Sequence, residues 1–338
     1  MIPTVHDVAR HAKVSISTVS RVINDSAPVS ADKKERVVAA IKALKFTPNP
    51  AARRLLGQAS RTIGVILPSI TGEFFADLLY GLDAAAKQHD YLLMVSSSRR
   101  LEIDFIAAFE SMNRRVDGMI IMVPELTAER VLSLVNPVFP FVFLNTKSED
   151  EKINVVNFDN RGGMASIARH LSDLGHTRVA FINGPDDAFD AQQRRQGFLE
   201  AAPSELEVLE YPGDFTFECG YDSAQKILRL QPRPTAIVAT NDLGALGALR
   251  ALLENGISIP QEIAITGFDG TGSAHFATPS LTTVDVPIDM LASKAVEILI
   301  SRIAGVPVDE LHCPVMPLEL IPRESSARKN VSSLLAGM

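Results

Sequence analysis

Cysteine is scarce in this chain, and several hallmarks of common protein classes are missing. Only Cys219 and Cys313 occur among 338 residues, which is too few for a disulfide framework or a structural zinc site. The sequence contains no run of about 18 apolar residues, the length that a membrane-spanning helix requires. The N-terminus has no basic segment followed by an apolar stretch, as a secretory signal would. We therefore expect a cytoplasmic protein with no membrane partner.

The motifs of several enzyme classes are also missing. The sequence contains no Gly-x-Gly-x-x-Gly, no Gly-x4-Gly-Lys-Ser/Thr, no His-Glu-x-x-His and no Gly-x-Ser-x-Gly. The histidines show no pairing typical of metal ligands; they are His6, His11, His89, His170, His176, His275 and His312. We therefore predict no catalytic residue, no metal and no cofactor, and expect that the protein is not an enzyme.

Charge is divided unevenly along the chain. The net charge is −7, which by itself argues against a nucleic-acid partner. Residues 1–61, however, hold 11 Lys and Arg against 4 acidic residues, a net of +7, and the remainder holds 22 against 36, a net of −14. A basic head on an acidic body indicates a polyanion-binding module joined to a domain with another task. A chance fluctuation of surface charge is the alternative.

Three helices are predicted in the first 46 residues. Thr4 and Asp7 resemble a capping box that begins the first helix. Ser15 can cap a second helix, and Ser30 begins a third that ends before Pro48. Two short helices joined by a tight turn and supported by a third form a helix-turn-helix. The positions expected to face inward are Val5, Val8, Ala9, Ala12, Val19, Val22, Ile23, Val37, Val38, Ile41 and Leu44.

The outward face of the second helix has residue types suited to the major groove of DNA. Arg21 suits a bidentate contact to guanine, Ser17 can bond to either base type, and Ile16 suits a thymine methyl group. The alternative is a three-helix packing module whose polar residues only meet water.

Residues 4–9, 14–15 and 17–24 resemble the DNA-binding signature of the lac repressor/galactose repressor family. In that family the two residues that begin the recognition helix vary with the operator. They are Ile16 and Ser17 here, and the aliphatic residue departs from the polar residues of several members, which leaves the half-site open. The resemblance implies these DNA contacts: Thr4, Ser15, Ile16, Ser17, Thr18, Ser20, Arg21 and Asn24.

Residues 47–60 can be an interdomain tether, because a helix over 51–56 is too short to be stable alone. The resemblance implies instead a hinge helix that folds on the operator and pairs with its copy in a second subunit. Leu55 would then be the DNA-binding residue that enters the minor groove as an apolar wedge.

From Arg61 onward, apolar runs rich in β-branched residues alternate with amphipathic segments. This alternation predicts parallel sheets covered on both faces, and the length predicts two α/β lobes with a cleft between them. Strands are expected at 62–68, 91–96, 118–123, 141–144, 178–182, 236–240 and 263–267, and helices at 74–89, 103–114, 162–174, 192–202, 221–230 and 243–255.

The family resemblance continues through landmarks at residues 116–120, 175–182, 240–242, 267–269, 279–284 and 320–323. It implies an N-terminal all-α helix-turn-helix domain followed by a two-lobed α/β domain like a periplasmic binding protein, with two parallel Rossmann-like sheets. The expected division is 1–46 for DNA binding, 47–60 for the hinge and 61–338 for effector binding and dimerisation. The first lobe would hold about 61–159 and 288–320, the second about 160–287, and the helix after Pro287 would return to the first lobe.

Ligands of parallel α/β lobes bind at the carboxyl ends of the strands. Aromatic walls with a few converging polar groups there suit a polyhydroxylated or heterocyclic ligand, with Asp269 accepting from paired hydroxyls opposite Arg194. The predicted effector-binding residues are Phe74, Phe75, Asn241 and Asp269 from strand ends, joined by Asp190, Arg194 and Phe215 from the resemblance.

A structural role is the alternative at three positions along this rim. Phe74 can be a core residue, Asp242 can cap the helix that follows it, and Arg194 can pair with Asp186 or Asp187.

The combined prediction is a homodimeric repressor that binds pseudopalindromic operator DNA and is controlled allosterically by a small molecule. A sugar or sugar derivative is the family expectation, although Phe215 also resembles members that respond to nucleosides or purines. The tail beyond Arg323 lacks sustained leucine heptads, so no tetramerising coiled coil is predicted. The competing classes are a solute-binding protein, a carbohydrate-modifying α/β enzyme and an architectural DNA-binding protein.

Overall fold

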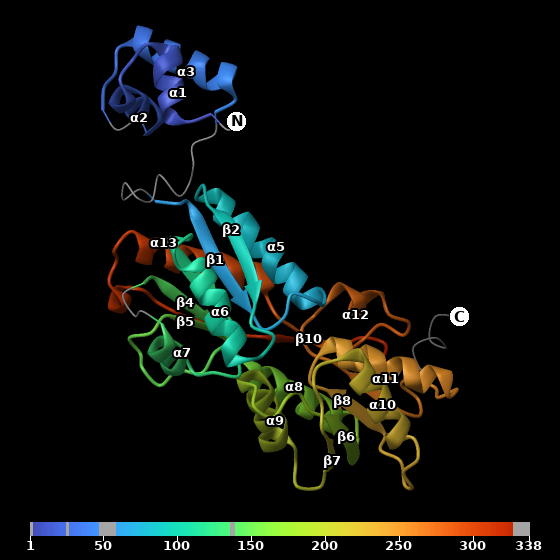
Figure 1. Cartoon of the computed structure of the whole chain (residues 1–338). Helices are drawn as coiled ribbons and strands as arrows, with labels where there is room; N and C mark the ends of the chain where they lie inside the picture. Colours follow the sequence, from blue (N-terminus) through green and yellow to red (C-terminus); the bar gives the residue numbers. More distant parts are fainter. Residues whose placement is uncertain (1–2, 25–26, 47–58, 136–138, 327–338) are drawn as a thin grey trace, which may run out of the picture. The chain divides into compact units, whose positions relative to one another are not determined.

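The computed structural model describes residues 3–24, 27–46, 59–135 and 139–326. The chain divides into two compact units, the head (Met1–Ser60) and the body (Arg61–Met338) (Figure 1). The predicted hinge residue Leu55 lies outside the described residues. Within the described ranges, no helix is long and apolar enough to cross a membrane. In the same ranges, no three His, Cys, Asp or Glu side chains are grouped so as to hold a metal ion.

The head consists of α1 (Val5–Ala12), α2 (Ile16–Asn24) and α3 (Ala31–Leu44). The predicted capping box at Thr4 and Asp7 begins α1, and the Ser15 hydroxyl accepts a hydrogen bond from the Thr18 N–H (3.2 Å) at the start of α2. The core residues are Val8, Ala9, Ala12, Val19, Val37 and Ala40.

Val38 was expected to face inward, and this prediction is wrong. The buried face of α3 runs through Val37 and Ala40. Val38 lies about 100° around the helix from Val37, and it is 53% exposed.

The first lobe of the body is built on a six-stranded parallel sheet with the order β11-β5-β4-β3-β1-β2. Its strands are β1 (Thr62–Leu67), β2 (Leu92–Ser97), β3 (Gly118–Ile121), β4 (Phe141–Leu144), β5 (Val155–Phe158) and β11 (Val315–Met316). Its helices are α5 (Glu73–Gln88), α6 (Glu102–Met112), α7 (Ala128–Leu134) and α13 (Ile288–Ile303).

Both faces of this sheet are buried at its central strands, as the unbroken apolar runs predicted, whereas the edge strand β2 is partly exposed. In β4, Val142 packs into one apolar cluster with Leu78 of α5 and Leu291 of α13. Its neighbour Phe143 packs into another with Phe105 of α6. Successive side chains of a strand point to opposite faces, so the helices form two covering layers.

The second lobe has a four-stranded parallel sheet with the order β7-β6-β8-β9. Its strands are β6 (Arg178–Ile182), β7 (Glu207–Tyr211), β8 (Ala236–Ala239) and β9 (Ala264–Thr266). Its helices are α8 (Asn160–Asp173), α9 (Phe189–Ala201), α10 (Phe217–Ile227), α11 (Asp242–Glu254) and α12 (Gly272–Phe276). All strands and helices predicted in the body are present, with ends shifted by a few residues; β5, β7 and α7 are among the elements that the prediction omitted.

The chain passes between the lobes three times. It enters the second lobe after β5, and it returns after β10 (Thr283–Asp285) to place α13 against α5. After the short η1 helix (Val308–Glu310) and β11, it crosses again, and β12 (Glu319–Ile321) pairs antiparallel with β10. Beyond β12 the Ser325 hydroxyl donates to the Ile265 carbonyl of β9 (2.6 Å). The last described segment is therefore part of the second lobe.

Candidate functional site

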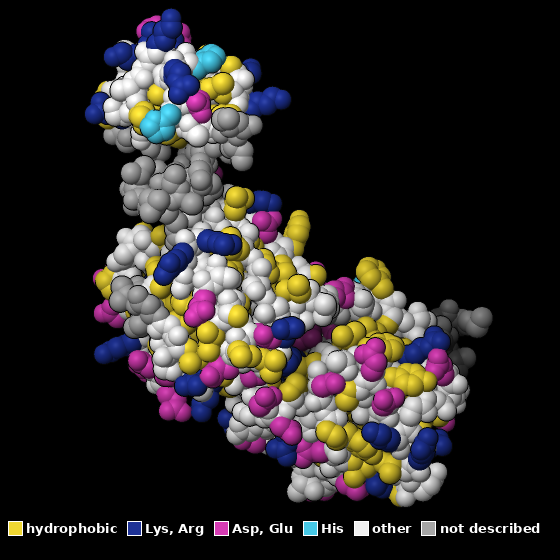
Figure 2. All heavy atoms as spheres, viewed as in Figure 1, with side chains coloured by type: hydrophobic (Ala, Val, Ile, Leu, Met, Phe, Trp, Pro, Cys, Tyr) yellow, Lys and Arg dark blue, Asp and Glu magenta, His cyan; other side chains and the backbone are white. Residues whose placement is uncertain are grey.

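The exposed face of α2 carries the residues predicted to contact bases. Ile16 is 43% exposed, and Ser17 and Arg21 are also exposed. Val19 is fully buried and lies about 160° around the helix from both Ser17 and Arg21. Lys and Arg side chains are spread over the visible face of the head in Figure 2. The head therefore presents a recognition helix whose contact residues take no part in its core.

A cluster of hydroxyl groups fixes the start of α2. The Ser15 Oγ lies 2.8 Å from the Ser17 Oγ and 2.9 Å from the Thr18 Oγ1. The turn before it is held from α3, because the Arg36 guanidinium donates to the Lys13 carbonyl (3.3 Å). Ser15 therefore orients the Ser17 hydroxyl, the group predicted to bond to a base.

The other predicted DNA contacts have different surroundings. Thr4 is exposed, and its hydroxyl donates to the Asp7 carboxylate (2.7 Å), a bond that holds the pKa of Asp7 below its ordinary value. Thr18 and Ser20 are half-buried, Asn24 is the last residue of α2, and Leu55 lies outside the described residues. Contact of these residues with DNA stays a prediction.

A cavity of about 390 Å³ lies between the two lobes of the body. Its walls follow the carboxyl ends of β1, β2 and β3 in the first lobe and of β7, β8 and β9 in the second, where ligands of such folds bind. The cavity brings together all seven predicted effector-site residues: Phe74, Phe75, Asp190, Arg194, Phe215, Asn241 and Asp269.

Aromatic rings form part of the cavity wall. Phe74 and Phe75 meet edge to face at 5.4 Å, and Phe74 also lies 6.5 Å from the ring of Phe158. Phe74 therefore both packs against the core and lines the cavity. In the second lobe Phe215 has a left-handed backbone with φ +66°, and a Cβ on Gly184 would lie 2.4 Å from its ring. Gly184 thus makes the room that the strained Phe215 needs.

Arg194 is the most buried charged residue of the site, with 3% of its surface exposed. Its Nη1 donates to the Thr240 carbonyl (2.6 Å) and to the Asp269 Oδ1 (3.2 Å), and its guanidinium lies 3.9 Å above the ring of Phe268. The alternative pairing with Asp186 or Asp187 is not what the structure has. Arg194 and Asp269 face each other, as the sequence predicted.

Asp269 carries an unusual backbone and an unusual proton affinity. Its φ is +124°, a region that residues other than glycine seldom adopt. Burial raises the pKa of its carboxyl, Arg194 acts in the opposite direction, and the nearby Asp242 and Asp190 add to the rise. Strain and a shifted pKa at one position are typical of functional sites.

Asp242 does not cap α11, so that interpretation is wrong. Asn241 is the N-cap and accepts from the Gly244 N–H (3.0 Å), while its amide donates to the Phe215 carbonyl (2.9 Å). Asp242 is fully buried instead and accepts from the Thr271 N–H (2.8 Å) and the Thr283 hydroxyl (2.5 Å). It therefore links the start of α11 to the start of α12 and to β10 behind the cavity.

Two buried asparagines connect Arg194 to the first lobe. The Arg194 Nε donates to the Asn160 Oδ1 (2.8 Å), and the Asn160 amide donates to the Asn145 Oδ1 (2.7 Å). Asn145 follows β4 of the first lobe, and Asn160 begins α8 of the second. The orientation of Arg194 thus depends on how the lobes meet.

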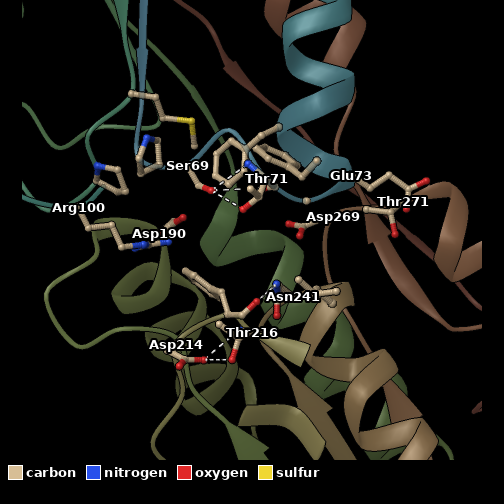
Figure 3. Close-up of a pocket in the computed structure, with 18 of the residues that line it drawn as sticks. Ser69, Thr71, Glu73, Arg100, Asp190, Asp214, Thr216, Asn241, Asp269 and Thr271 are labelled. Carbon is tan, nitrogen blue, oxygen red and sulfur yellow. Dashed lines mark hydrogen bonds between the residues drawn. The ribbon is translucent and has the colours of Figure 1, made fainter. Parts of the chain in front are cut away.

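Sequence reasoning missed other residues of the cavity wall. Arg100 donates to the Glu125 carboxylate (2.7 Å) and lies 5.5 Å from the ring of Phe215. Glu73 of the first lobe accepts from the Ser273 N–H of the second (3.0 Å). Figure 3 shows Arg100 and Asp190 on one side of the cavity and Glu73 and Thr271 on the other. Arg100 could have been found, because it follows the carboxyl end of β2.

Known proteins resemble both units. Residues 4–49 match the family model of bacterial regulatory proteins of the lacI family, and residues 168–326 match a periplasmic binding protein-like domain. The ribose operon repressor of Escherichia coli (strain K12) is 33% identical over 321 residues, which cover 93% of this chain and 97% of that protein. The HTH-type transcriptional repressor CytR of the same strain is 30% identical over 331 residues, 96% of each chain.

Among solved structures, the lac repressor dimer bound to operator and the anti-inducer ONPF matches with a TM-score of 0.86 at 29% identity. The match covers 97% of this chain and 100% of that one. The helix-turn-helix head, the two-lobed body and these matches agree over nearly the whole length. This chain belongs to the lacI family of bacterial regulatory proteins, which regulate transcription by binding DNA.

Proposed function

We propose that this protein is a cytoplasmic homodimeric repressor that releases or grips a pseudopalindromic operator according to the small molecule in its interlobe cavity. The observation that carries the proposal is the cavity itself, which gathers all seven predicted effector residues in a chain whose head exposes a recognition helix. One head offers few base contacts, so two heads on two half-sites supply the specificity.

The effector acts on the lobes in this proposal. Its contacts with Arg194 and Asp269 bear on the Asn160–Asn145 bridge between the lobes. A change in lobe orientation would then order or melt the hinge segment, with Leu55 as its minor-groove wedge. We propose no turnover of the ligand.

A sugar is the first candidate for the effector. The Asp269 carboxylate can accept from paired hydroxyls while Arg194 donates beside it, and the relative with 33% identity is named a ribose operon repressor. A nucleoside or purine is the second candidate, favoured by the ring of Phe215 on the cavity wall, because a flat base can stack on an aromatic ring.

The test is selection of operator fragments from genomic DNA by the purified full-length protein, followed by titration of sugars and nucleosides into the complex. We expect at least one of these compounds to change operator affinity by about 5- to 150-fold and to be recovered unchanged. Leu55→Ala should weaken operator binding far more than binding to random DNA. Equal losses would refute the wedge, and a protein that selects no DNA sequence would refute the regulator.

A further inference from the structure

The charges that line the interlobe cavity are unbalanced. Carboxylates outnumber guanidinium groups on its wall. The carboxylates are those of Glu73, Asp190, Asp214 and Asp269, and the guanidinium groups are those of Arg100 and Arg194. In Figure 3 these acidic side chains surround the cavity from several sides.

Both arginines already have acidic partners. Arg194 pairs with Asp269 (3.2 Å), and Arg100 pairs with Glu125 (2.7 Å), whose side chain is 7% exposed. An anionic ligand group could engage either arginine only by competing with a carboxylate that the protein itself supplies. Among the described residues of the cavity wall, neither arginine is therefore available to an anion without losing its acidic partner.

The remaining wall carboxylates receive hydrogen bonds from neutral groups. Asp214 accepts from the Thr216 N–H (2.9 Å) and hydroxyl (2.6 Å), and Asp190 accepts from the Ala191 N–H (2.9 Å). Glu73 accepts from the Ser273 N–H. Among the ion pairs of the described residues none involves these three carboxylates, so their charge is not neutralised.

Burial raises the pKa of two carboxyls at the cavity, and repulsion from neighbouring acids adds to the rise. Burial raises the pKa of Glu125; Arg100 acts in the opposite direction, but Asp190 and Asp187 add to the rise. Asp190 likewise adds to the raised pKa of Asp269. A further negative charge in this low-dielectric space would meet the same repulsion.

Helices α5, α9, α10 and α11 begin at the cavity wall, and their N-termini could attract an anion. Helix N-termini favour negative groups, and residues 72–75 border the cavity. Each of these four helices, however, already has an acidic residue in its first turn, namely Glu73, Asp190, Glu218 and Asp242.

We propose that the cavity selects an uncharged ring with several hydroxyl groups and rejects the phosphorylated or carboxylated form of the same ring. This inference rests on the proposed function, in which the cavity holds the effector. It identifies that effector as a free sugar or nucleoside and excludes a sugar phosphate or nucleotide.

The test is calorimetric titration of the full-length protein with matched pairs at about pH 7. The probes are D-ribose and D-ribose 5-phosphate, D-glucose and D-glucose 6-phosphate, and cytidine and cytidine monophosphate. We expect a neutral member to bind and its phosphorylated partner to bind about 100-fold more weakly or not at all. A phosphorylated member that binds as tightly as its neutral partner overturns the inference but leaves the proposed regulator intact. Failure of every probe refutes the proposed effector class and this inference with it.

A charge variant locates the origin of the selectivity. Asp214→Asn removes one wall charge and keeps an oxygen that can accept from Thr216, so it should narrow the preference for the neutral member by about threefold. Asp173→Asn is the matched control, since Asp173 is an exposed residue of the same lobe that does not line the cavity. If both variants changed the preference for the neutral probe equally, the preference would come from the net charge of the protein, and the proposed role of the cavity carboxylates would be refuted.

Discussion

The head and the body place their candidate functional residues in opposite environments. In the head, Ile16, Ser17 and Arg21 are exposed above a core of six small or β-branched buried residues. In the body, Arg194 and Asp269 are 3% and 8% exposed and belong to a buried polar network. The head can therefore change these three residues with little effect on its stability, whereas the body cannot change Arg194 or Asp269 without affecting folding.

The largest effect should follow Arg194→Ala, which tests whether a ligand-binding residue of the body is also needed for its stability. It leaves the Asp269 carboxylate buried without its cation, so we expect a loss of about 3–5 kcal/mol in the free energy of unfolding. Effector affinity should fall by about 100-fold or more, because the same guanidinium lines the cavity. Urea unfolding and effector titration measure the two losses.

The neighbouring residue provides the matched control. Arg195 pairs with Glu210 at the surface, with half of its side chain exposed, and exposed pairs contribute about 0–1 kcal/mol. Arg195→Ala should therefore change the stability little and the effector affinity not at all. Similar losses in the two variants would contradict the special status of the buried pair.

Arg21→Ala tests whether a DNA-contact residue of the head can be changed without loss of stability. We expect the stability to change by less than about 0.5 kcal/mol, while operator binding weakens by about 1–3 kcal/mol and becomes less selective at one base pair. Lys33→Ala, on the exposed face of α3, removes the same charge away from the recognition helix. It should weaken operator and random DNA alike, and an equal change in selectivity would argue against base contact by Arg21.

A smaller effect is expected for Ser15→Ala. The substitution removes the N-cap of α2 and should destabilise the head by about 1 kcal/mol. Ser17→Ala removes a hydroxyl of the same cluster but not the cap, so it should leave the head's stability nearly unchanged. Hydrogen exchange of the α2 amides in the full-length protein distinguishes the two; equal exchange would show that the cap contributes nothing.

The smallest effect concerns Glu129 and depends on pH. Burial would raise the pKa of Glu129, but hydrogen bonds from Ser148 and from backbone N–H groups outweigh it and lower the pKa to about 2. A lowered carboxyl pKa stabilises the folded state above the ordinary value of 4.5, and this stability is lost as the pH falls toward 2.

Glu129→Gln should accordingly lower the free energy of unfolding by less than about 1 kcal/mol at neutral pH, because water screens the partly solvated side chain. The difference in the free energy of unfolding between wild type and variant should become smaller below the ordinary pKa. Urea unfolding at neutral and acidic pH measures this difference. Glu149→Gln, at a side chain that is 81% exposed, is the control. A gap that stays constant with pH would refute the assignment to Glu129.

Local signals account for most of the fold and for much of the cavity. Capping residues and helical periodicity defined α1 to α3, and apolar β-branched runs located the central strands of both sheets. The rule that ligands bind at strand ends placed Phe74, Asn241 and Asp269 on one rim from the sequence alone. The same rule applied to β2 would have added Arg100.

Other features could not be predicted because they depend on distant contacts. β7 is the edge strand of its sheet, and its residues are exposed or half-buried. Its sequence therefore lacks the unbroken apolar run by which a central strand is recognised. Asp242 follows a strand like a capping residue, yet its partner Thr271 caps α12 and its partner Thr283 begins β10, and only the folded lobe brings both near. The Asn145–Asn160 bridge has no local signal at all.

The three passages of the chain between the lobes also affect the order in which the two sheets can fold during synthesis. The first lobe begins at β1, but its sheet is completed only when β11 emerges, more than 240 residues later. The second lobe, in contrast, has all four strands of its parallel sheet within one continuous stretch of about 90 residues. Since chains fold from the N-terminus as they leave the ribosome, the parallel sheet of the second lobe can form before that of the first lobe is complete, and β12 joins the second lobe last.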